Sequence, residues 1–395
     1  MTARSALQFV VVMGVVNLFA DMTYEGGRGE VGAFLGHLGA SGAIVGLVAG
    51  GGELAGYAIR SLAGTVADRT GKYWLDAWIG YAINMLCVPA LALAGSWPAA
   101  AGLVVGERLG RGIRRPVISA MLAEAGREMG GRGFAFGLNE ALDQTGATIG
   151  PLIVAYVIAR TGAFSTAFAV LIVPALLTLV SLLPASKLGA RLVPRPDAFR
   201  ADAFREPAIR DRAAFWRYAI GGALVAAGYV DFSLIAFRFQ RDHVVSIAAI
   251  SVWFAVAMVV AAIASPVLGR LYDRFGNAVV AATIAVGALA APLAFLGSGA
   301  IAESGASLWG LGTAVQDALL LALVASVITK GRGATTFGLY DLIFGVAWFA
   351  GSAVLGALLD RSTVALTVVS VVLQLAAIPV FVTGAKPAAG SLPSQ

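Results

Sequence analysis

The stretch "GTVADRTGK" at residues 64–72 lies between two long apolar segments of the chain. The stretch "GRLYDRFGN" at residues 269–277 repeats its pattern, Gly-x-x-x-Asp-Arg-x-Gly, 205 residues further on and again between apolar segments. The same polar loop pattern thus occurs twice, each time between long apolar segments. This indicates a duplicated unit in a membrane protein.

The composition also indicates a membrane protein. Of the 395 residues, 59% are hydrophobic and 13% are charged. Soluble domains carry roughly 25% charged residues, and a soluble chain this apolar would expose patches that aggregate. The net charge of +6 is interpreted as a topology signal in loops, so no nucleic-acid partner is expected. The single cysteine, Cys87, excludes an intrachain disulfide.

Apolar windows long enough to cross a bilayer recur along the chain. A hydrocarbon core of about 30 Å needs roughly 20 apolar residues in a helix. The windows are continuous, whereas the strands of a membrane barrel alternate apolar and polar residues. We therefore predict an all-α integral membrane fold with twelve transmembrane helices. They lie near residues 6–36, 40–66, 74–95, 98–124, 133–158, 163–184, 214–240, 244–268, 278–297, 303–328, 334–358 and 363–383.

Basic residues divide the loops into two sides. Most loop Lys and Arg residues fall on one side, and only Arg28, Arg160, Arg238, Arg241 and Arg361 fall at or near the other. Cytoplasmic loops are rich in Lys and Arg, so we expect both termini in the cytoplasm. The first apolar stretch lacks a small-x-small cleavage site and is interpreted as a retained helix. The expected location is the cell membrane, the inner membrane in a bacterium, with many passes.

A polar, Arg-rich segment with three prolines divides the chain near its middle. Long polar segments between helices are usually linkers. We predict an N-terminal six-helix bundle at residues 1–185, a cytoplasmic linker at 186–213 and a C-terminal six-helix bundle at 214–395. The linker arginines are expected to contact anionic lipid.

The two halves share further patterns. The stretch "GRGFAFGLNEAL" (131–142) returns as "GRGATTFGLYDLI" (331–343), and the first helix of each half carries an Asp and an Arg seven residues apart. The matched pairs are Glu140 and Asp341, Gly150 and Gly351, Asp21 and Asp231, and Arg28 and Arg238. An even number of spans precedes the second copy, so the halves are predicted to be parallel repeats.

These features together resemble the major facilitator superfamily of secondary transporters. The doubled loop is similar to that family's G-x-x-x-D-R-x-G-[RK]-[RK] between helices 2 and 3. The matching residues are Gly64, Asp68, Arg69, Gly71 and Lys72 in the first copy and Gly269, Asp273, Arg274 and Gly276 in the second. The resemblance implies gate loops whose contacts hold the cytoplasmic side shut. A turn that only sets topology is the alternative.

Two stretches of the first half refine the resemblance. "GERLGRGIRRP" (106–116) resembles the family's Arg-bearing motif of helix 4 and implies that Arg108 is an intramembrane arginine. "GATIGP", with Gly146, Gly150 and Pro151, matches G-x-x-x-G-P, which the resemblance associates with drug/proton antiporters. A G-x-x-x-G pattern also serves plain helix packing.

Charged and polar residues inside the predicted spans are the candidates for a transport site. A charge at mid-bilayer costs on the order of 2.5–3.5 kcal/mol, so such residues rarely persist without a function. The proton-coupling candidates are Asp21, Glu25, Glu53, Glu140 and Asp143. The candidates for the substrate cavity are Asn17, Tyr24, Arg60, Arg108, Arg111, Asn139, Gln144, Asp231, Arg238, Asp317 and Asp341. Asp21 and Glu53 are favoured for coupling because both would face a helix-4 arginine if the family's packing holds. For any one residue, a structural ion pair is the alternative.

We therefore expect a secondary transporter that works by alternating access, and not an enzyme. The helix-4 arginines disfavour a purely cationic substrate. The expected function is a proton-coupled antiporter that exports a small amphipathic, anionic or zwitterionic organic compound. A proton-coupled symporter that takes up a small organic anion is the alternative, and a membrane-embedded enzyme or sensor is a remote one.

The expected driving force is the proton gradient. The sequence has no phosphate-binding loop of the form G-x-x-x-x-G-K-[ST], so neither nucleotide hydrolysis nor another cofactor is expected. The two histidines are too isolated for a metal site. The expected partners are the small-molecule substrate, protons and membrane lipid around a monomer.

Overall fold

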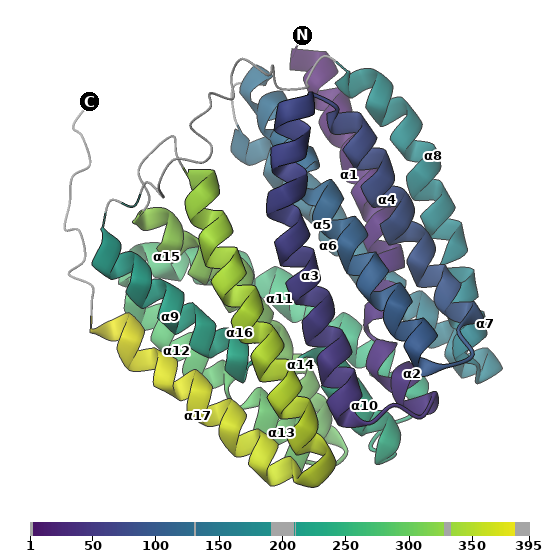
Figure 1. Cartoon of the computed structure of the whole chain (residues 1–395), viewed down its shortest axis with the longest axis vertical. Coiled ribbons are helices and arrows are strands. Elements are labelled where there is room, and N and C mark those ends of the chain that lie inside the picture. Colours follow the sequence, from purple (N-terminus) through teal and green to yellow (C-terminus); the bar gives the residue numbers. More distant parts are fainter. Residues whose placement is uncertain (1–2, 130–131, 191–208, 210, 328–332, 384–395) are drawn as a thin grey trace.

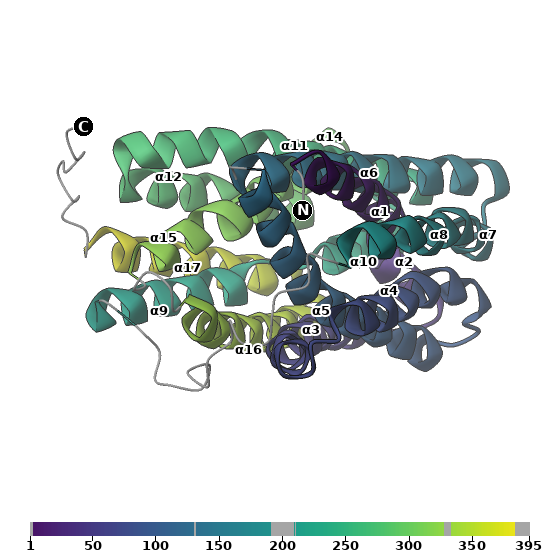
Figure 2. The same ribbon diagram turned by 90° about the horizontal axis from the view of Figure 1, so that it is seen from above.

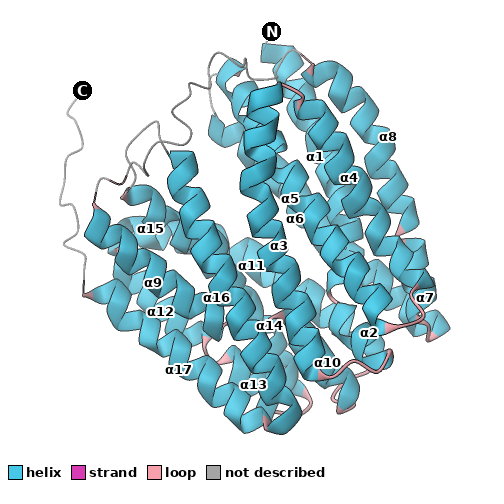
Figure 3. Cartoon of the chain, viewed as in Figure 1, coloured by secondary structure: helices cyan, strands magenta, loops and turns pink. Residues whose placement is uncertain are grey.

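The computed structural model describes residues 3–129, 132–190, 209, 211–327 and 333–383. Within helices, the side chains of Asp68 and Asp317, among others, lie outside the described part. The described residues form helices joined by short turns (Figure 3).

The N-terminal half contains eight α-helices in the described residues, some of them halves of one broken span. They are α1 (Ala3–Arg28), α2 (Val31–His37), α3 (Gly42–Thr70), α4 (Tyr73–Ala90), α5 (Trp97–Glu128), α6 (Arg132–Thr161), α7 (Phe164–Val170) and α8 (Ile172–Gly189). A short 3-10 turn, Leu91–Leu93, follows α4.

The C-terminal half repeats this arrangement. Its helices are α9 (Arg212–Gly228), α10 (Phe232–Arg241), α11 (Ile247–Phe275), α12 (Asn277–Gly287), α13 (Ala290–Leu296), α14 (Ala300–Ala314), α15 (Leu321–Ser326), α16 (Gly333–Arg361) and α17 (Thr363–Val382). A π-helical segment, Val315–Leu320, joins α14 to α15. Residues 191–208 and 210 of the predicted linker, between α8 and α9, lie outside the described residues.

The predicted all-α membrane fold is confirmed, since each of the twelve windows corresponds to one helix or to a broken helix. Ten spans among the described residues are long and apolar enough to cross a membrane. Helix α5 is not among them because charged residues interrupt its apolar sequence. The breaks, such as the one at Glu30 between α1 and α2, were not predicted.

The helices form two bundles that meet along one seam (Figures 1 and 2). Helix α1 packs on α6 and α4 packs on α5 within the first half, while α3 against α16 and α6 against α11 join the halves. Figure 1 shows the ribbons of α3 and α16 diverging toward the end of the molecule where α1 begins and α8 ends. We call this the divergent end, and the opposite end, where α2 meets α10, the closed end.

Backbone contacts between the halves hold the closed end together. A Cβ atom on Gly32 of α2 would lie 1.7 Å from the Ser233 carbonyl oxygen of α10, and one on Gly46 of α3 would lie 2.2 Å from the Ser352 oxygen of α16. Asp360 at the end of α16 accepts hydrogen bonds from the first amides of α3, at 2.7 and 2.8 Å. Only glycine permits such approaches, so these helices touch without intervening side chains.

The "GATIGP" stretch packs α6 against α1. A Cβ on Gly146 would lie 2.1 Å from the Leu18 oxygen, and one on Gly150 would lie 2.2 Å from the Met22 oxygen. The contact is of the G-x-x-x-G packing type. Whether the motif also marks an antiporter stays a prediction.

The same packing gives the true offset between the halves. Gly351 approaches the Ala227 oxygen as Gly150 approaches the Met22 oxygen, so α1 and α9 correspond at an offset of 205 residues. The predicted pairing of Asp21 and Arg28 with Asp231 and Arg238, at an offset of 210, is therefore wrong. Asp21 lies inside α1, whereas Asp231 follows α9 and caps α10.

The two Gly-x-x-x-Asp-Arg-x-Gly loops end their helices in the same way. Gly71 and Gly276 are the C-caps of α3 and α11, with φ of 67° and 61°, a conformation that glycine adopts without strain. A Cβ on Gly64 would only touch Pro116, at 3.5 Å, and one on Gly269 would meet nothing within 4 Å. Neither glycine therefore supports a close helix approach in this conformation.

The charged residues of these loops lie at the divergent end. Arg69, Lys72, Asp273 and Arg274 are all exposed. Exposed loop charges are compatible with gate contacts that are open in this conformation, and the latch role stays a prediction. The Asp68 side chain lies outside the described part of the chain.

We expect Gly150→Val to lower the melting temperature of the purified protein by several degrees, because the new side chain would collide with backbone of α1. Overpacking of this kind costs about 1–3 kcal/mol. Gly137→Ala on the same helix is the control, since a Cβ there meets nothing within 4 Å. Thermal unfolding in detergent measures both variants. Equal melting temperatures for the two would contradict the packing argument.

Candidate functional site

Helix α5 carries arginines at one-turn spacing into a buried polar cluster. The Arg108 Nε atom lies 3.2 Å from Glu53 Oε1 on α3, and its Nη1 atom lies 3.1 Å from Glu107 Oε2. The Tyr24 hydroxyl on α1 accepts hydrogen bonds from Arg108 and, at 2.5 Å, from Arg111. Glu53 thus faces an arginine of α5, which is the fourth predicted span. This is the geometry on which its selection as a coupling candidate depended.

Arg114 extends the cluster one turn along α5. Its guanidinium lies 3.7 Å from Asp21 Oδ1 and donates to Asn84 at 3.1 Å and to Asn17 at 3.4 Å. The Tyr81 hydroxyl donates to the same Asn17 oxygen at 2.5 Å. Asp21 is therefore held by a neighbouring arginine, as Glu53 is.

Helix α6 closes the cluster from the other side of α1. Asn17 donates to Asn139 at 2.8 Å, which joins two of the predicted cavity residues. The side chains of Asp21 and Asp143 lie close enough to interact electrostatically. Two neighbouring carboxylates repel each other, which favours a proton on one of them. The pair can thus hold and release a proton as a unit.

Arg28, the last residue of α1, reaches the C-terminal half. It lies 3.5 Å from Glu25 and 3.9 Å from Glu53, and its Cζ atom lies 5.9 Å from the ring centres of both Tyr24 and Trp309. Because Trp309 belongs to α14, Arg28 connects the polar cluster with the opposite half.

Arg60 makes a second connection between the halves. Its Nη1 atom lies 3.3 Å from Asp341 Oδ2 on α16, and its guanidinium stacks over Tyr57 at 4.8 Å. The Tyr57 ring in turn contacts Phe344 of α16, with ring centres 6.0 Å apart. Arg60 and Asp341, both predicted cavity residues, therefore meet at the interface between the halves.

The C-terminal half faces this cluster with aromatic residues. Trp309 stacks on Tyr229 with ring centres 5.2 Å apart, and Tyr229 contacts Trp348 at 5.5 Å. Phe232 and Phe254 extend the same group. The Trp309 indole donates to the Val230 oxygen at 2.7 Å, so the ring is fixed in place. The N-terminal half thus contributes charged side chains, and the C-terminal half contributes aromatic rings.

Several predicted residues lie apart from the cluster. Asp231 is buried as the N-cap of α10, and Arg238 binds the carbonyl oxygens of Ala294 and Gly297 at the end of α13. Both side chains have a structural use in this conformation, and their role in a substrate cavity stays a prediction. Glu140 is exposed and accepts a hydrogen bond from Gln144 at 2.9 Å. Asp317 has its side chain outside the described part.

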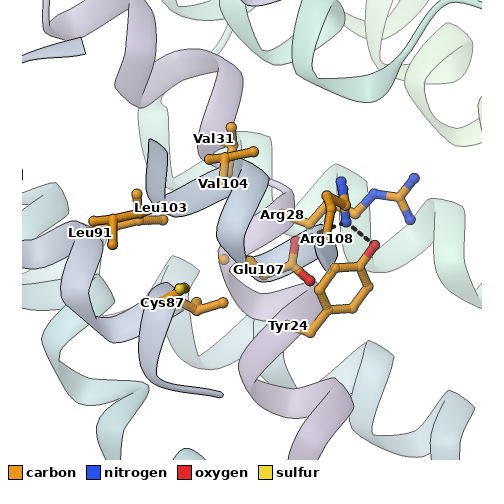
Figure 4. A pocket seen from close by; sticks show the side chains of 11 residues that line it. Tyr24, Arg28, Val31, Cys87, Leu91, Leu103, Val104, Glu107 and Arg108 are labelled. Atoms are coloured by element: carbon orange, nitrogen blue, oxygen red, sulfur yellow. Dashed lines mark hydrogen bonds and ion pairs between the residues drawn. The ribbon is translucent and has the colours of Figure 1, made fainter. Parts of the chain in front are cut away.

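A small cavity adjoins the cluster inside the N-terminal half (Figure 4). It is lined by Tyr24, Gly27, Arg28, Val31, Cys87, Val88, Leu91, Leu103, Val104, Glu107 and Arg108. Its free space of about 20 Å³ has room for about one water molecule, so the cavity does not hold an organic substrate in this conformation. In Figure 4, Tyr24, Glu107 and Arg108 form its polar end.

Several cluster residues were missing from the predicted site. They are Tyr81, Asn84, Glu107 and Arg114. Glu107 and Arg114 are charges inside an apolar run, which is the signal that could have included them. Tyr81 and Asn84 carry no comparable signal, because only the packing of α4 on α5 makes them polar partners.

Comparisons with known proteins agree with this geometry. The family model described as Major Facilitator Superfamily matches residues 7–352. Uncharacterized proteins of Mycobacterium tuberculosis and Mycobacterium bovis are 36% identical over 383 residues, covering 95% of this chain and 92% of theirs.

Solved transporter structures share the fold. A nucleoside transporter, NupG, has a TM-score of 0.72 at 14% identity and covers 94% of this chain and 99% of its own. A peptide transporter, POT, in complex with sulfate has a TM-score of 0.75 at 16% identity, with 95% and 93% covered. A bacterial homolog to the human lysosomal transporter Spinster, inward-facing and unoccupied, has a TM-score of 0.71 at 16% identity, with 96% and 95% covered. The chain is a multi-pass membrane protein and a transporter that belongs to the Major Facilitator Superfamily.

Proposed function

We propose that this transporter couples protons to the movement of a small organic compound that bears an anionic group, by alternating access. The preferred mode is antiport with export of an amphipathic or zwitterionic compound. The proton gradient supplies the free energy, and the protein acts as a monomer in the cell membrane with both termini in the cytoplasm.

The observation that carries the proposal is the state of Arg111. Its guanidinium contacts the Tyr24 hydroxyl and ring, and it forms no ion pair within 4 Å in the described part of the chain. Arg108 and Arg114 on the same helix are each paired with a carboxylate. Arg111 is half-buried, and a half-buried cation without an acidic partner favours binding of an anion from outside the protein.

The proton would bind at Asp21 and Asp143. These two carboxyl groups are neighbours, and Asp21 lies beside Arg114, one turn along α5 from Arg111. A substrate anion at Arg111 and a proton at this pair would then interact through space. Such proximity is what coupling between substrate and proton requires.

The charge of the substrate sets the mode of coupling. A zwitterion with its carboxylate at Arg111 would bring its ammonium group toward Asp21 and Asp143, where it would compete with the proton. Competition for one site gives antiport. A simple anion at Arg111 would instead strengthen proton binding at the pair, so that both bind together, and this favours symport. The unpaired Arg111 is the observation that keeps the symporter as a second candidate.

The contacts between the halves support alternating access. If basic loops mark the cytoplasmic side, the closed end faces outward and the divergent end faces the cytoplasm. The protein would then be open to the cytoplasm in this conformation. Moving to the other state would require breaking the contacts of Gly32, Gly46 and Asp360 and making new ones among the exposed loop charges.

We expect Asp21→Asn and Asp143→Asn each to abolish substrate-dependent proton movement in proteoliposomes. Either change removes a titratable group from the pair. A pH-sensitive dye inside the vesicles and a labelled substrate outside measure both fluxes. Glu128→Gln, at the end of α5, is the control and should couple normally. Antiport moves protons against the substrate, and symport moves them with it. Unchanged saturable substrate flux after collapse of the proton gradient would refute proton coupling.

We expect Arg111→Gln to weaken binding of anionic and zwitterionic compounds about 10- to 100-fold. The loss of a charge-assisted hydrogen bond costs about 1.5–3 kcal/mol. Ligands are found first by a thermal-shift screen of small metabolites and drugs with the wild-type protein. Arg160→Gln, at the far end of α6, is the matched control. Equal affinity of wild type and Arg111→Gln for every ligand found would contradict the assignment of Arg111.

A further inference from the structure

Glu30 lies at the break between α1 and α2, where the two halves meet at the closed end. Its side chain is 0% exposed. Ser251 of α11, in the other half and equally buried, donates its hydroxyl to Glu30 Oε1 at 2.5 Å. The carboxyl group therefore hydrogen-bonds across the contact between the halves.

The Glu30 carboxyl has no cation beside it in the described part of the chain. Its second oxygen, Oε2, has no hydrogen-bond partner there. Although Glu30 occupies the N-cap position of α2, its side chain makes no capping hydrogen bond. A carboxylate taken out of water without a cation or a full set of donors is strongly disfavoured against its protonated form. The closed arrangement therefore favours a proton on Glu30.

The charged groups on the elements around Glu30 are engaged elsewhere. Arg28 faces Glu25 and Glu53, Asp231 caps α10 and Arg238 binds the end of α13. The others are His37 on α2, Glu107 and Arg108 on α5, Arg160 on α6, Arg241 on α10, Glu303 on α14, Asp360 on α16, and Arg270, Asp273 and Arg274 at the far end of α11. Among the described residues, none of them forms an ion pair with Glu30.

Packing around Glu30 shields it from bulk water while the closed end is shut. A Cβ on Gly29 would lie 3.0 Å from the Phe254 ring of α11, and one on Gly32 would overlap the Ser233 oxygen. Separation of α2 and α11 would break the bond to Ser251 and admit water to the carboxyl group. Hydration removes the penalty for ionisation.

We propose that Glu30 is a proton-dependent lock of the closed end. The protonated side chain holds α1 and α2 to Ser251 of α11, and the ionised side chain favours the state in which the halves separate there. Acid outside the cell thus shifts the transporter toward the conformation open to the cytoplasm. The lock rests on the proposed alternating access but is distinct from the coupling pair, because Asp21 and Asp143 lie within one half.

Distance measurements between the halves test the lock without substrate. Spin labels are placed at His37→Cys on α2 and Ser298→Cys before α14, both exposed positions, in a Cys87→Ser background. Double electron–electron resonance in lipid nanodiscs, from about pH 5 to about pH 8.5, reports the populations with the closed end shut or open. We expect the long-distance population of the wild type to grow as the pH rises.

The variants separate the lock from general loosening. Glu30→Gln, a neutral mimic of the protonated side chain, should keep the short distance at every pH. Ser251→Ala should raise the open population at low pH. Asp360→Asn is the matched control, since it weakens another contact of the closed end but should leave the pH response in place.

The distance measurements test the Glu30 lock without a transport assay. A wild type whose distances do not change with pH, or a Glu30→Gln variant that responds to pH as the wild type does, would overturn it. Should Glu30→Gln not fold, Glu30→Asp keeps the acid but shortens its reach to Ser251. It should retain the pH response with a larger open population, and a response identical to the wild type would overturn the lock. Because no proton flux is measured, failure of proton coupling would leave this result standing.

Discussion

The burial of the α5 arginines is the constraint on which the rest of the structure depends. Each desolvated guanidinium costs several kcal/mol, and a close carboxylate together with hydrogen-bond acceptors offsets that cost. Arg108 has Glu53 of α3 and its neighbour Glu107, and Arg114 has Asp21 of α1. Since these partners come from different helices, the pairs fix the rotation of α1, α3 and α5 against one another. A helix too polar to cross a bilayer alone is stable inside this bundle.

Small residues make that pairing possible. The glycines of α6 bring it against the backbone of α1, which carries Asn17 and Asp21 within reach of Asn139 and Asp143. The closed end uses the same device between the halves, so the contact there is backbone against backbone. The acid Glu30 lies in such a contact, shielded from bulk water and without an ion-pair partner among the described residues. Under the proposal, protonation of Glu30 therefore changes the stability of the closed end. Asp360 is exposed and caps α3, so its protonation is not expected to have this effect.

The fold could be predicted from the sequence because apolar length and the doubled loop are local signals. The site was predicted in part. A charged residue in an apolar run can be recognised from the sequence, but the residue that it pairs with cannot. Arg108 and Arg111 were predicted for the site, yet Arg114 is the arginine that meets Asp21, because residues three apart on a helix lie on nearly the same face. The places of Asp231 and Arg238 depended on a helix break that periodicity does not reveal. Glu30 was overlooked because it lies in a Gly-rich stretch two residues after Arg28, which is not a charge inside a continuous apolar run.

The asymmetry between the halves bears on how coupling would operate. The arginines, Tyr24 and the Asp21–Asp143 pair all lie in the N-terminal half, whereas the C-terminal half contributes mainly aromatic rings. Rocking of the halves would therefore leave the distance between a substrate anion at Arg111 and the proton pair nearly constant. It would change the contacts of Arg28 with Trp309 and of Arg60 with Asp341, which cross the seam. Under the proposed mechanism, binding of substrate and proton changes the net charge of the N-terminal half, which moves as a rigid unit. The contacts of Arg28 and Arg60 with the C-terminal half then form or break in response.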